Sequence, residues 1–168
     1  TELLRSFAPS LNVKIASQIK LHAEARYFTA EGDQLGRGPL PPKVGQVTKY
    51  WINWFVTTAP NAIKNVTLLG HLPEGVMWTN KIKVAEGEPI KFDPITRSVS
   101  WQNDRLEATP GNRCPCAGVG FEVAVSPTAD DAGKILTLLN QLSIQATDEA
   151  TGEELKGLSP NITTDLIK

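Results

Sequence analysis

The sequence lacks the features that identify membrane proteins, nucleic-acid-binding proteins and most enzymes. No apolar run approaches the roughly 20 residues that a membrane-spanning helix needs, so we expect no membrane insertion by this chain. Basic and acidic residues nearly balance, at 17 and 18, and no basic patch marks a nucleic-acid partner. No serine-hydrolase elbow, zinc-protease helix, phosphate loop or dinucleotide fingerprint occurs. We therefore expect a protein that is not an enzyme and has no catalytic or cofactor-binding residue.

Histidine and cysteine are scarce, with two of each in 168 residues. His22 and His71 fall within strand patterns, and His71 in LLGHLPEG is better explained as a residue at a strand end than as a general base. Cys114 and Cys116 in NRCPCAG have three possible interpretations: two loop thiols without a function, a strained disulfide, or half of a zinc site. The distant histidines are poor candidates for the two further zinc ligands. The pair is kept as a candidate disulfide, because an exported protein meets oxidising surroundings.

Acidic residues gather in predicted turns, where we expect most of them to be solvated. Loop carboxylates at Asp33, Asp130, Asp131 and Asp148 would suit calcium if they converged, since hard cations take several oxygen ligands. No D-x-D-x-D-G ladder supports such a site. We expect no metal site, and calcium is the one ion that stays open.

Short strand-like segments separated by turn formers fill the chain. Surface scaling predicts that an 18.3 kDa domain buries about two thirds of its unfolded surface, enough for a core without metal or disulfide support. Turn sequences such as APNA, LPEG, AEGEP and ATPGN recur every 8–16 residues, which is the rhythm of a β-sandwich. The main helix candidate is 131–142, but its continuation alternates and a strand fits equally well. The pattern predicts an all-β protein.

Alternation of apolar residues predicts which side chains face inward. The first strand pattern covers 11–29 with a break at Ser17 and Gln18, and a Gly- and Pro-rich loop follows at 30–45. We expect Glu122 to face outward. The predicted inner face comprises Val66, Leu68, Val99, Trp101, Phe121, Val123, Val125, Leu142, Ile144 and Ala146, and Trp54 is expected in the same core.

The segment QVTKYWINWFVTTAP carries aromatic residues on both faces of its predicted strand. Tyr50 and Trp54 share the inner phase, whereas Trp51 and Phe55 occupy the phase that should be polar. A large exposed apolar patch is uncommon on a monomer, so we expect a cover for these two rings. The candidates are the 30–45 loop, which we favour, a neighbouring module or subunit, and a sugar stacked on open rings. We assign Trp51 and Phe55 to structure and assembly, as a candidate interface.

Four motifs occur in a characteristic order along the chain. A Y-x-I-x-W strand at Tyr50–Val56 is followed by L-P-x-G-V-x-W at Leu72–Trp78, D-P-x-T-x-x-V-x-W at Asp93–Trp101, and F-x-V-x-V-x-P at Phe121–Pro127. This order resembles the Ig-like conserved repeat domain of bacterial and archaeal cell-surface proteins, over roughly residues 13–166. The resemblance implies an Ig-like antiparallel β-sandwich of seven to nine strands at the cell surface or outside the cell. It implies no catalytic residue, since members of that family are mostly spacers and adhesive modules.

We expect a non-catalytic structural module of a larger cell-surface or appendage protein, stacked in tandem or assembled with like modules. The chain begins at Thr1 rather than at a methionine, so we expect it to be a piece of a longer protein. Because FAPS has no partner pattern within the domain, we expect 1–10 to be a linker or the tail of a preceding module, and 11–168 to be the Ig-like domain. The closing SPNITTDLIK should lead out at the end of the sandwich opposite to the first strand's start. The alternative is a carbohydrate-binding or adhesive module that uses exposed aromatics and has a glycan as its partner.

Overall fold

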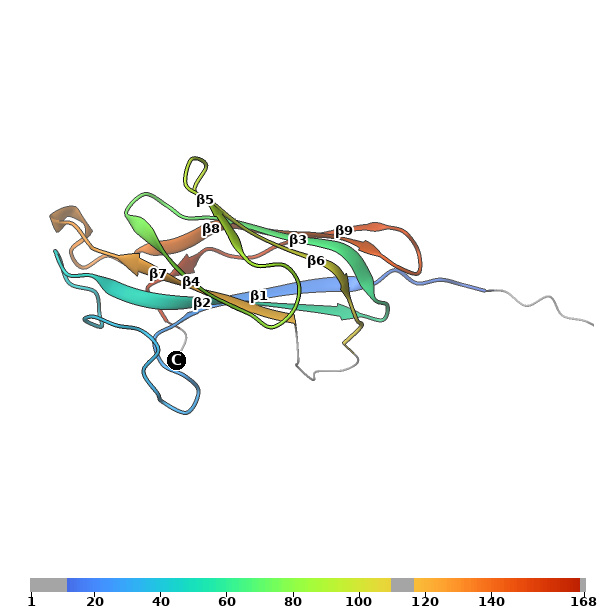
Figure 1. Ribbon diagram of the computed structural model, residues 1–168, viewed down its shortest axis with the longest axis horizontal. Coiled ribbons are helices and arrows are strands. Elements are labelled where there is room, and N and C mark those ends of the chain that lie inside the picture. Colours follow the sequence, from blue (N-terminus) through green and yellow to red (C-terminus); the bar gives the residue numbers. More distant parts are fainter. Residues whose placement is uncertain (1–11, 110–116, 167–168) are drawn as a thin grey trace, which may run out of the picture.

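Two antiparallel β-sheets stacked face to face form the protein (Figure 1). The computed structural model describes residues 12–109 and 117–166. In chain order the elements are β1 (Gln18–Arg26), β2 (Thr48–Ala59), β3 (Ile63–His71), β4 (Val76–Val84), β5 (Lys91–Asp93), β6 (Ser98–Leu106), β7 (Ala117–Val125), the 3₁₀ turn η1 (Ala129–Asp131), β8 (Thr137–Asp148), β9 (Glu154–Leu158) and β10 (Ile162–Thr163). One sheet has the order β1-β2-β7-β4, and the other has the order β10-β8-β3-β6-β5 with β9 also paired to β8.

The strand order is that of an immunoglobulin-like sandwich and confirms the predicted fold class. The sheet β1-β2-β7-β4 has the A-B-E-D order of that fold, and β3-β8-β9 has its C-F-G order. The β5–β6 pair extends the second sheet on the side of β3 away from β8. The described residues contain ten strands, one more than the predicted seven to nine, and the two shortest, β5 and β10, have only three and two residues.

The core lies between the sheets and takes every second residue of each strand. In β2, Ile52 and Trp54 are fully buried, as period-two alternation of a half-buried strand predicts. Trp54 meets Phe121 edge to face with ring centroids 5.1 Å apart, and Trp101 belongs to the same buried cluster. All ten residues of the predicted inner face are buried. The predicted core is therefore confirmed, and each large side chain in it contributes about 1.5–3 kcal/mol.

Two sequence patterns resolve into elements with different bounds from those predicted. The first pattern spans 11–29, but β1 begins only at Gln18, next to the predicted break, and the described residues before it form no strand. In 131–142 the strand interpretation is right, since β8 begins at Thr137 after the short turn η1. No helix within 12–109 and 117–166 is long and apolar enough to cross a membrane.

The described chain is attached at opposite ends of β8. At one end, here called the N-terminal pole, the backbone N–H of Ser17 donates to the buried carboxylate of Asp148, 2.8 Å away. At the other end, the C-terminal pole, the N–H of Thr164 donates to the carbonyl of Leu136 over 2.8 Å. Twelve residues of strand separate the poles by roughly 35–40 Å. The segment after β9 thus reaches the predicted end of the sandwich, but there it pairs with β8 as β10 and packs Leu166 against the core.

Candidate functional site

The two aromatic residues of interest lie on the outer face of the β1-β2-β7-β4 sheet. Trp51 and Phe55 are partly buried, so neither ring is fully open to solvent in the isolated chain. In the strand register, Trp51 lies between Arg26 of β1 and Glu122 of β7, and Phe55 lies opposite His22 of β1. The His22 and Phe55 rings stack, with centroids 6.1 Å apart and an angle of 18°.

Glycines in β7 explain why this outer face carries aromatic residues. Gly118 pairs with Phe55 and Gly120 pairs with Asn53, so β7 offers no side chains to cover its own outer surface there. A Cβ atom at Gly120 would lie 2.7 Å from Asn53 Oδ1 and 3.6 Å from Trp51 Cε3. The side chains of β2 therefore cover the glycine backbone of β7, as larger side chains do beside strand glycines. The alternate glycines of AGVG were the sequence signal for this arrangement.

The loop at 30–45, which we favoured as the cover, is hydrogen-bonded to the beginning of β2 and to Tyr27. The N–H of Arg37 donates to the carbonyl of Lys49, and Thr48 Oγ1 donates to the carbonyl of Pro39. The Tyr27 hydroxyl donates to the carbonyl of Gly38 in the same loop. These bonds hold the loop beside the first residues of β2. The assignment of Trp51 and Phe55 to an interface stays a prediction.

Glu122 has the predicted outward phase but is only 2% exposed. Its carboxylate lies 3.6 Å from Lys49 Nζ and 3.3 Å from Lys81 Nζ, which bring one lysine from each neighbouring strand. Burial of a carboxylate is costly unless counter-charges compensate for it, and here two ammonium groups do so. The outer face thus has a buried carboxylate paired with two partly exposed lysines next to Trp51. The alternation of the sequence predicted correctly which face of the sheet Glu122 lies on, but it did not predict that Glu122 is buried.

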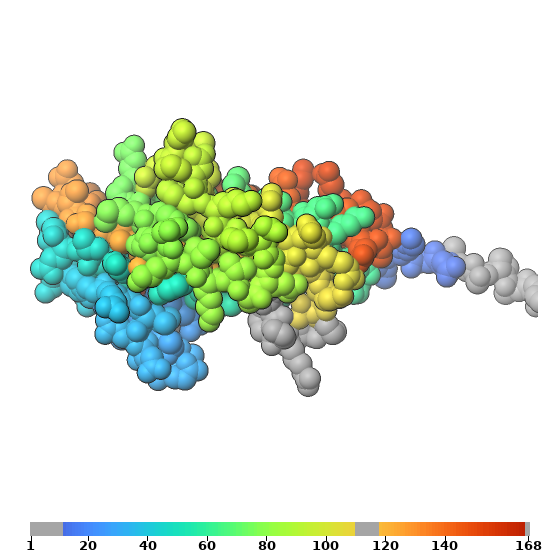
Figure 2. All heavy atoms as spheres, in the orientation of Figure 1, coloured from blue at the N-terminus to red at the C-terminus, as the bar shows by residue number. Residues whose placement is uncertain are grey.

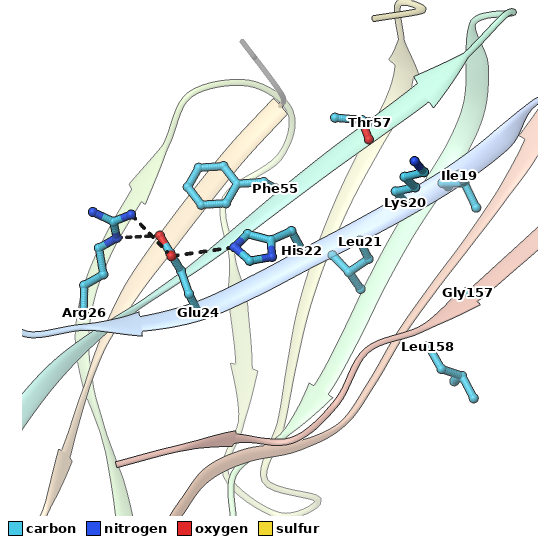
Figure 3. A pocket seen from close by; sticks show the side chains of 10 residues that line it. All are labelled: Ile19, Lys20, Leu21, His22, Glu24, Arg26, Phe55, Thr57, Gly157 and Leu158. Atoms are coloured by element: carbon cyan, nitrogen blue, oxygen red, sulfur yellow. Dashed lines mark hydrogen bonds and ion pairs between the residues drawn. The ribbon is translucent and has the colours of Figure 1, made fainter. Parts of the chain in front are cut away.

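A groove runs along the open edge of β1 and separates it from the segment Gly157–Asp165. We call it the β1 groove. Its first part, of about 820 Å³, is shown in Figure 3, with Ile19 and Leu21 of β1 on one side and Gly157 and Leu158 on the other. Ile19 and Leu21, in the inner phase of β1, are only partly buried there, and Leu158 is 85% exposed on the facing wall. Adjoining hollows of about 320 and 860 Å³ continue the groove toward Leu166.

The edge of β1 that borders the groove has no strand partner among the described residues. All nine residues of β1 pair with β2 without a bulge, and the other side of β1 ends the sheet. The outer-phase side chains include Glu24, which pairs with Arg26 and whose hydrogen bond raises the pKa of that guanidinium. A long regular edge next to an apolar groove is the usual template for the addition of another strand.

A cluster around Asp148 fixes the N-terminal pole. Besides Ser17, the carboxylate accepts from Asn61 Nδ2 at 3.0 and 3.2 Å and from the N–H and hydroxyl of Thr151. Burial would raise the pKa of Asp148, but the hydrogen bonds from Asn61 and Ser17 outweigh burial and hold the pKa well below its usual range. Asn61 Nδ2 also donates to the carbonyl of Ile15 over 2.7 Å, so the segment before β1 is fixed by two bonds.

The other residues proposed as ligands are not brought together. Within the part of the chain that the structure describes, no group of three or more His, Cys, Asp or Glu side chains could hold a metal ion. This part includes the four aspartates considered for calcium. His71 is the last residue of β3, as expected, and its Nδ1 lies 3.2 Å from Asn140 Oδ1. Cys114 and Cys116 lie outside the described residues.

Comparison with known proteins finds similar solved structures. No protein-family model and no curated protein matches the chain. Among solved structures, it is similar to a 35 kDa C-terminal fragment of a major pilin of Streptococcus agalactiae, with 11% identity and a TM-score of 0.47. The match covers 86% of this chain and 56% of that fragment, so the chain spans little more than half of the fragment's length. A similarity this low assigns neither an activity nor a partner to this chain.

Proposed function

We propose that this chain is a non-catalytic structural module of a larger cell-surface or appendage protein, assembled with like modules outside the cell. The observation that carries the proposal is the attachment of the chain at opposite poles of one strand. Residues before Ser17 leave from the Asp148 end of β8, and the residues after β9 are bound at the Leu136 end. Modules joined end to end need this arrangement, because each must receive and pass on the chain at opposite ends.

The structure of the poles suits a fixed rather than a freely jointed connection. The segment before β1 is held by the carboxylate of Asp148 and the side chain of Asn61, so its direction is set over residues 15–17. In Figures 1 and 2, this segment projects from the narrow end of the domain along its long axis. A preceding module attached through it would lie in line with this one.

The proposal is tested on the cells from which the chain derives. An antiserum raised against the folded chain should label intact cells in immunogold electron microscopy, and protease added outside should remove the label. Labelling that requires permeabilised cells would contradict the proposal. The sequence of the parent protein gives a second test, since tandem modules predict recurrence of the four motifs at intervals of about 150 residues.

The carbohydrate-binding alternative is tested separately. It needs Trp51 or Phe55 to stack on a sugar ring, so glycan-array binding should be present in the wild type and lost in Trp51→Ser. A glycan array that gives no signal with the wild type would contradict the carbohydrate-binding alternative.

A further inference from the structure

The segment Asn12–Ala16 has the pattern of a strand without a sheet. Val13 is 72% exposed and Ile15 is 68% exposed, although both are large and apolar. They alternate with Lys14, so an extended chain places the two apolar side chains on one face and the lysine on the other. The segment therefore has the composition of an edge strand, and no described strand pairs with it.

The segment cannot reach the open edge of its own β1. It continues directly into β1 through Ser17, whose N–H is held by Asp148, and the carbonyl of Ile15 is held by Asn61. To turn back onto β1 the chain would have to reverse at Ser17 and break both bonds. Figure 2 shows the segment pointing away from the domain. A strand partner for it would therefore come from outside the described domain.

We propose that residues 12–16 of one copy of this chain bind in the β1 groove of a second copy and add a strand to its β1-β2-β7-β4 sheet. This inference rests on the proposed function, because it names the contact through which like modules assemble. The unpaired backbone edge of β1 supplies the hydrogen-bonding groups, and the partly buried Ile19 and Leu21 with Leu158 supply the apolar surface. Both are what recognition by strand addition requires.

The spacing of the apolar side chains agrees between the two surfaces. Val13 and Ile15 are two positions apart, the spacing at which Ile19 and Leu21 present their side chains along β1. With the apolar pair turned into the groove, Lys14 faces the outer side of the sheet, where Glu24 of β1 pairs with Arg26. Asp165 also lines the groove, on the wall opposite to β1. A five-residue strand is a small contact, so the free chain should associate weakly and reversibly. Tethering in an array would raise the local concentration and favour the contact.

The test measures self-association of the full chain by sedimentation velocity over about a hundredfold range of concentration, with a thiol reductant present to prevent cysteine cross-links. The wild type should show a reversible increase in average mass. The double substitution Val13→Ser/Ile15→Ser removes the inserted side chains, and Leu158→Lys places a charge on the groove wall. Each should weaken the dimer about tenfold or more.

Two matched variants control for the loss of an exposed apolar residue elsewhere. Ile135→Ser changes a residue that is 64% exposed, and Ile95→Lys changes one that is 91% exposed, and neither lines the β1 groove. Both should associate as the wild type does. All the substituted residues are exposed, and unchanged thermal unfolding should show that every variant folds.

Carbodiimide cross-linking of mixed ¹⁴N- and ¹⁵N-labelled chains locates the contact. An amide between Lys14 of one isotope and Glu24 or Asp165 of the other would support the proposal. A wild type that stays monomeric, association that the Val13/Ile15 and Leu158 variants leave unchanged, or cross-links that place Lys14 elsewhere would overturn it. Surface labelling of intact cells decides the proposed function independently, so either idea can fail while the other stands.

Discussion

Asp148→Asn should weaken the N-terminal pole more than any other single isosteric change. The carboxylate of Asp148 accepts from five donors, which are Ser17 N, Asn61 Nδ2, Ala150 N, Thr151 N and Thr151 Oγ1. An asparagine side chain keeps one acceptor oxygen and turns an NH₂ group toward donor hydrogens. Whichever way the amide is oriented, some of these donors lose their acceptor in a buried site.

The expected magnitude follows from the hydrogen bonds. A bond to a charged group contributes about 1.5–3 kcal/mol, and a buried donor left without an acceptor costs about 1–3 kcal/mol. Bonds in one network are not additive, so we expect Asp148→Asn to lower the free energy of unfolding by about 3–5 kcal/mol. Such a loss is a large part of the about 5–15 kcal/mol that stabilises a typical domain.

Urea unfolding followed by tryptophan fluorescence measures this loss. Asp130→Asn is the matched control, because Asp130 is an exposed aspartate in the turn η1. Native-state hydrogen exchange should also be faster at the amide of Ser17 in Asp148→Asn than in the control. A loss below about 1 kcal/mol, or equal losses in the two variants, would refute the view that Asp148 organises this pole.

The pH dependence of the free energy of unfolding tests the role of Asp148 independently. The folded pKa of Asp148 lies below the unfolded value of about 3.9, so its contribution is complete above about pH 4 and is lost as the pH falls through the folded pKa. The difference in stability between wild type and Asp148→Asn should therefore be largest near neutral pH and shrink below about pH 4. A difference that grows on acidification would contradict the assignment.

Three further substitutions test the core and the outer face by equilibrium unfolding. Trp101→Ala should cost about 3–5 kcal/mol, because it empties a fully buried site, and a cost below about 1 kcal/mol would contradict that packing. Gly120→Ala should cost about 1–3 kcal/mol through the clash with Asn53, and Asn53→Ala should recover part of it if the clash is the cause. Trp51→Ser should lower the melting temperature of the isolated chain, since the ring covers β7; an unchanged melting temperature would show that it does not.

The strands and the core could be predicted because they depend on local alternation. Each residue of the inner face is specified by its neighbours two positions away, so Trp54, Trp101 and Phe121 were assigned correctly without knowing which strands pair. The order of the motifs then predicted the Ig-like arrangement, which the sheet topology confirms.

The properties of the outer face and of the N-terminal pole were not predicted. They depend on contacts between segments that are far apart in the sequence. The cost of burying Glu122 is offset by Lys49 and Lys81, which come from the two strands on either side of it. Asp148 was considered as a calcium ligand, but its oxygens accept from Ser17, 131 positions earlier. Neither relation has a signature in the local sequence, since it exists only once the strand order is known.

The attachment of the chain at opposite poles has a mechanical consequence. A force that pulls residues before Ser17 away from residues after Thr164 acts parallel to the strands, because β1 begins at one pole and β10 lies at the other. The nine residue pairs between β1 and β2 are then loaded together in shear and cannot open one after another. On the C-terminal side the same pull is carried by the two residue pairs of β10 and the five pairs of β9 with β8, so single-molecule stretching should show that this side yields first and that the β1–β2 pairing resists the longest.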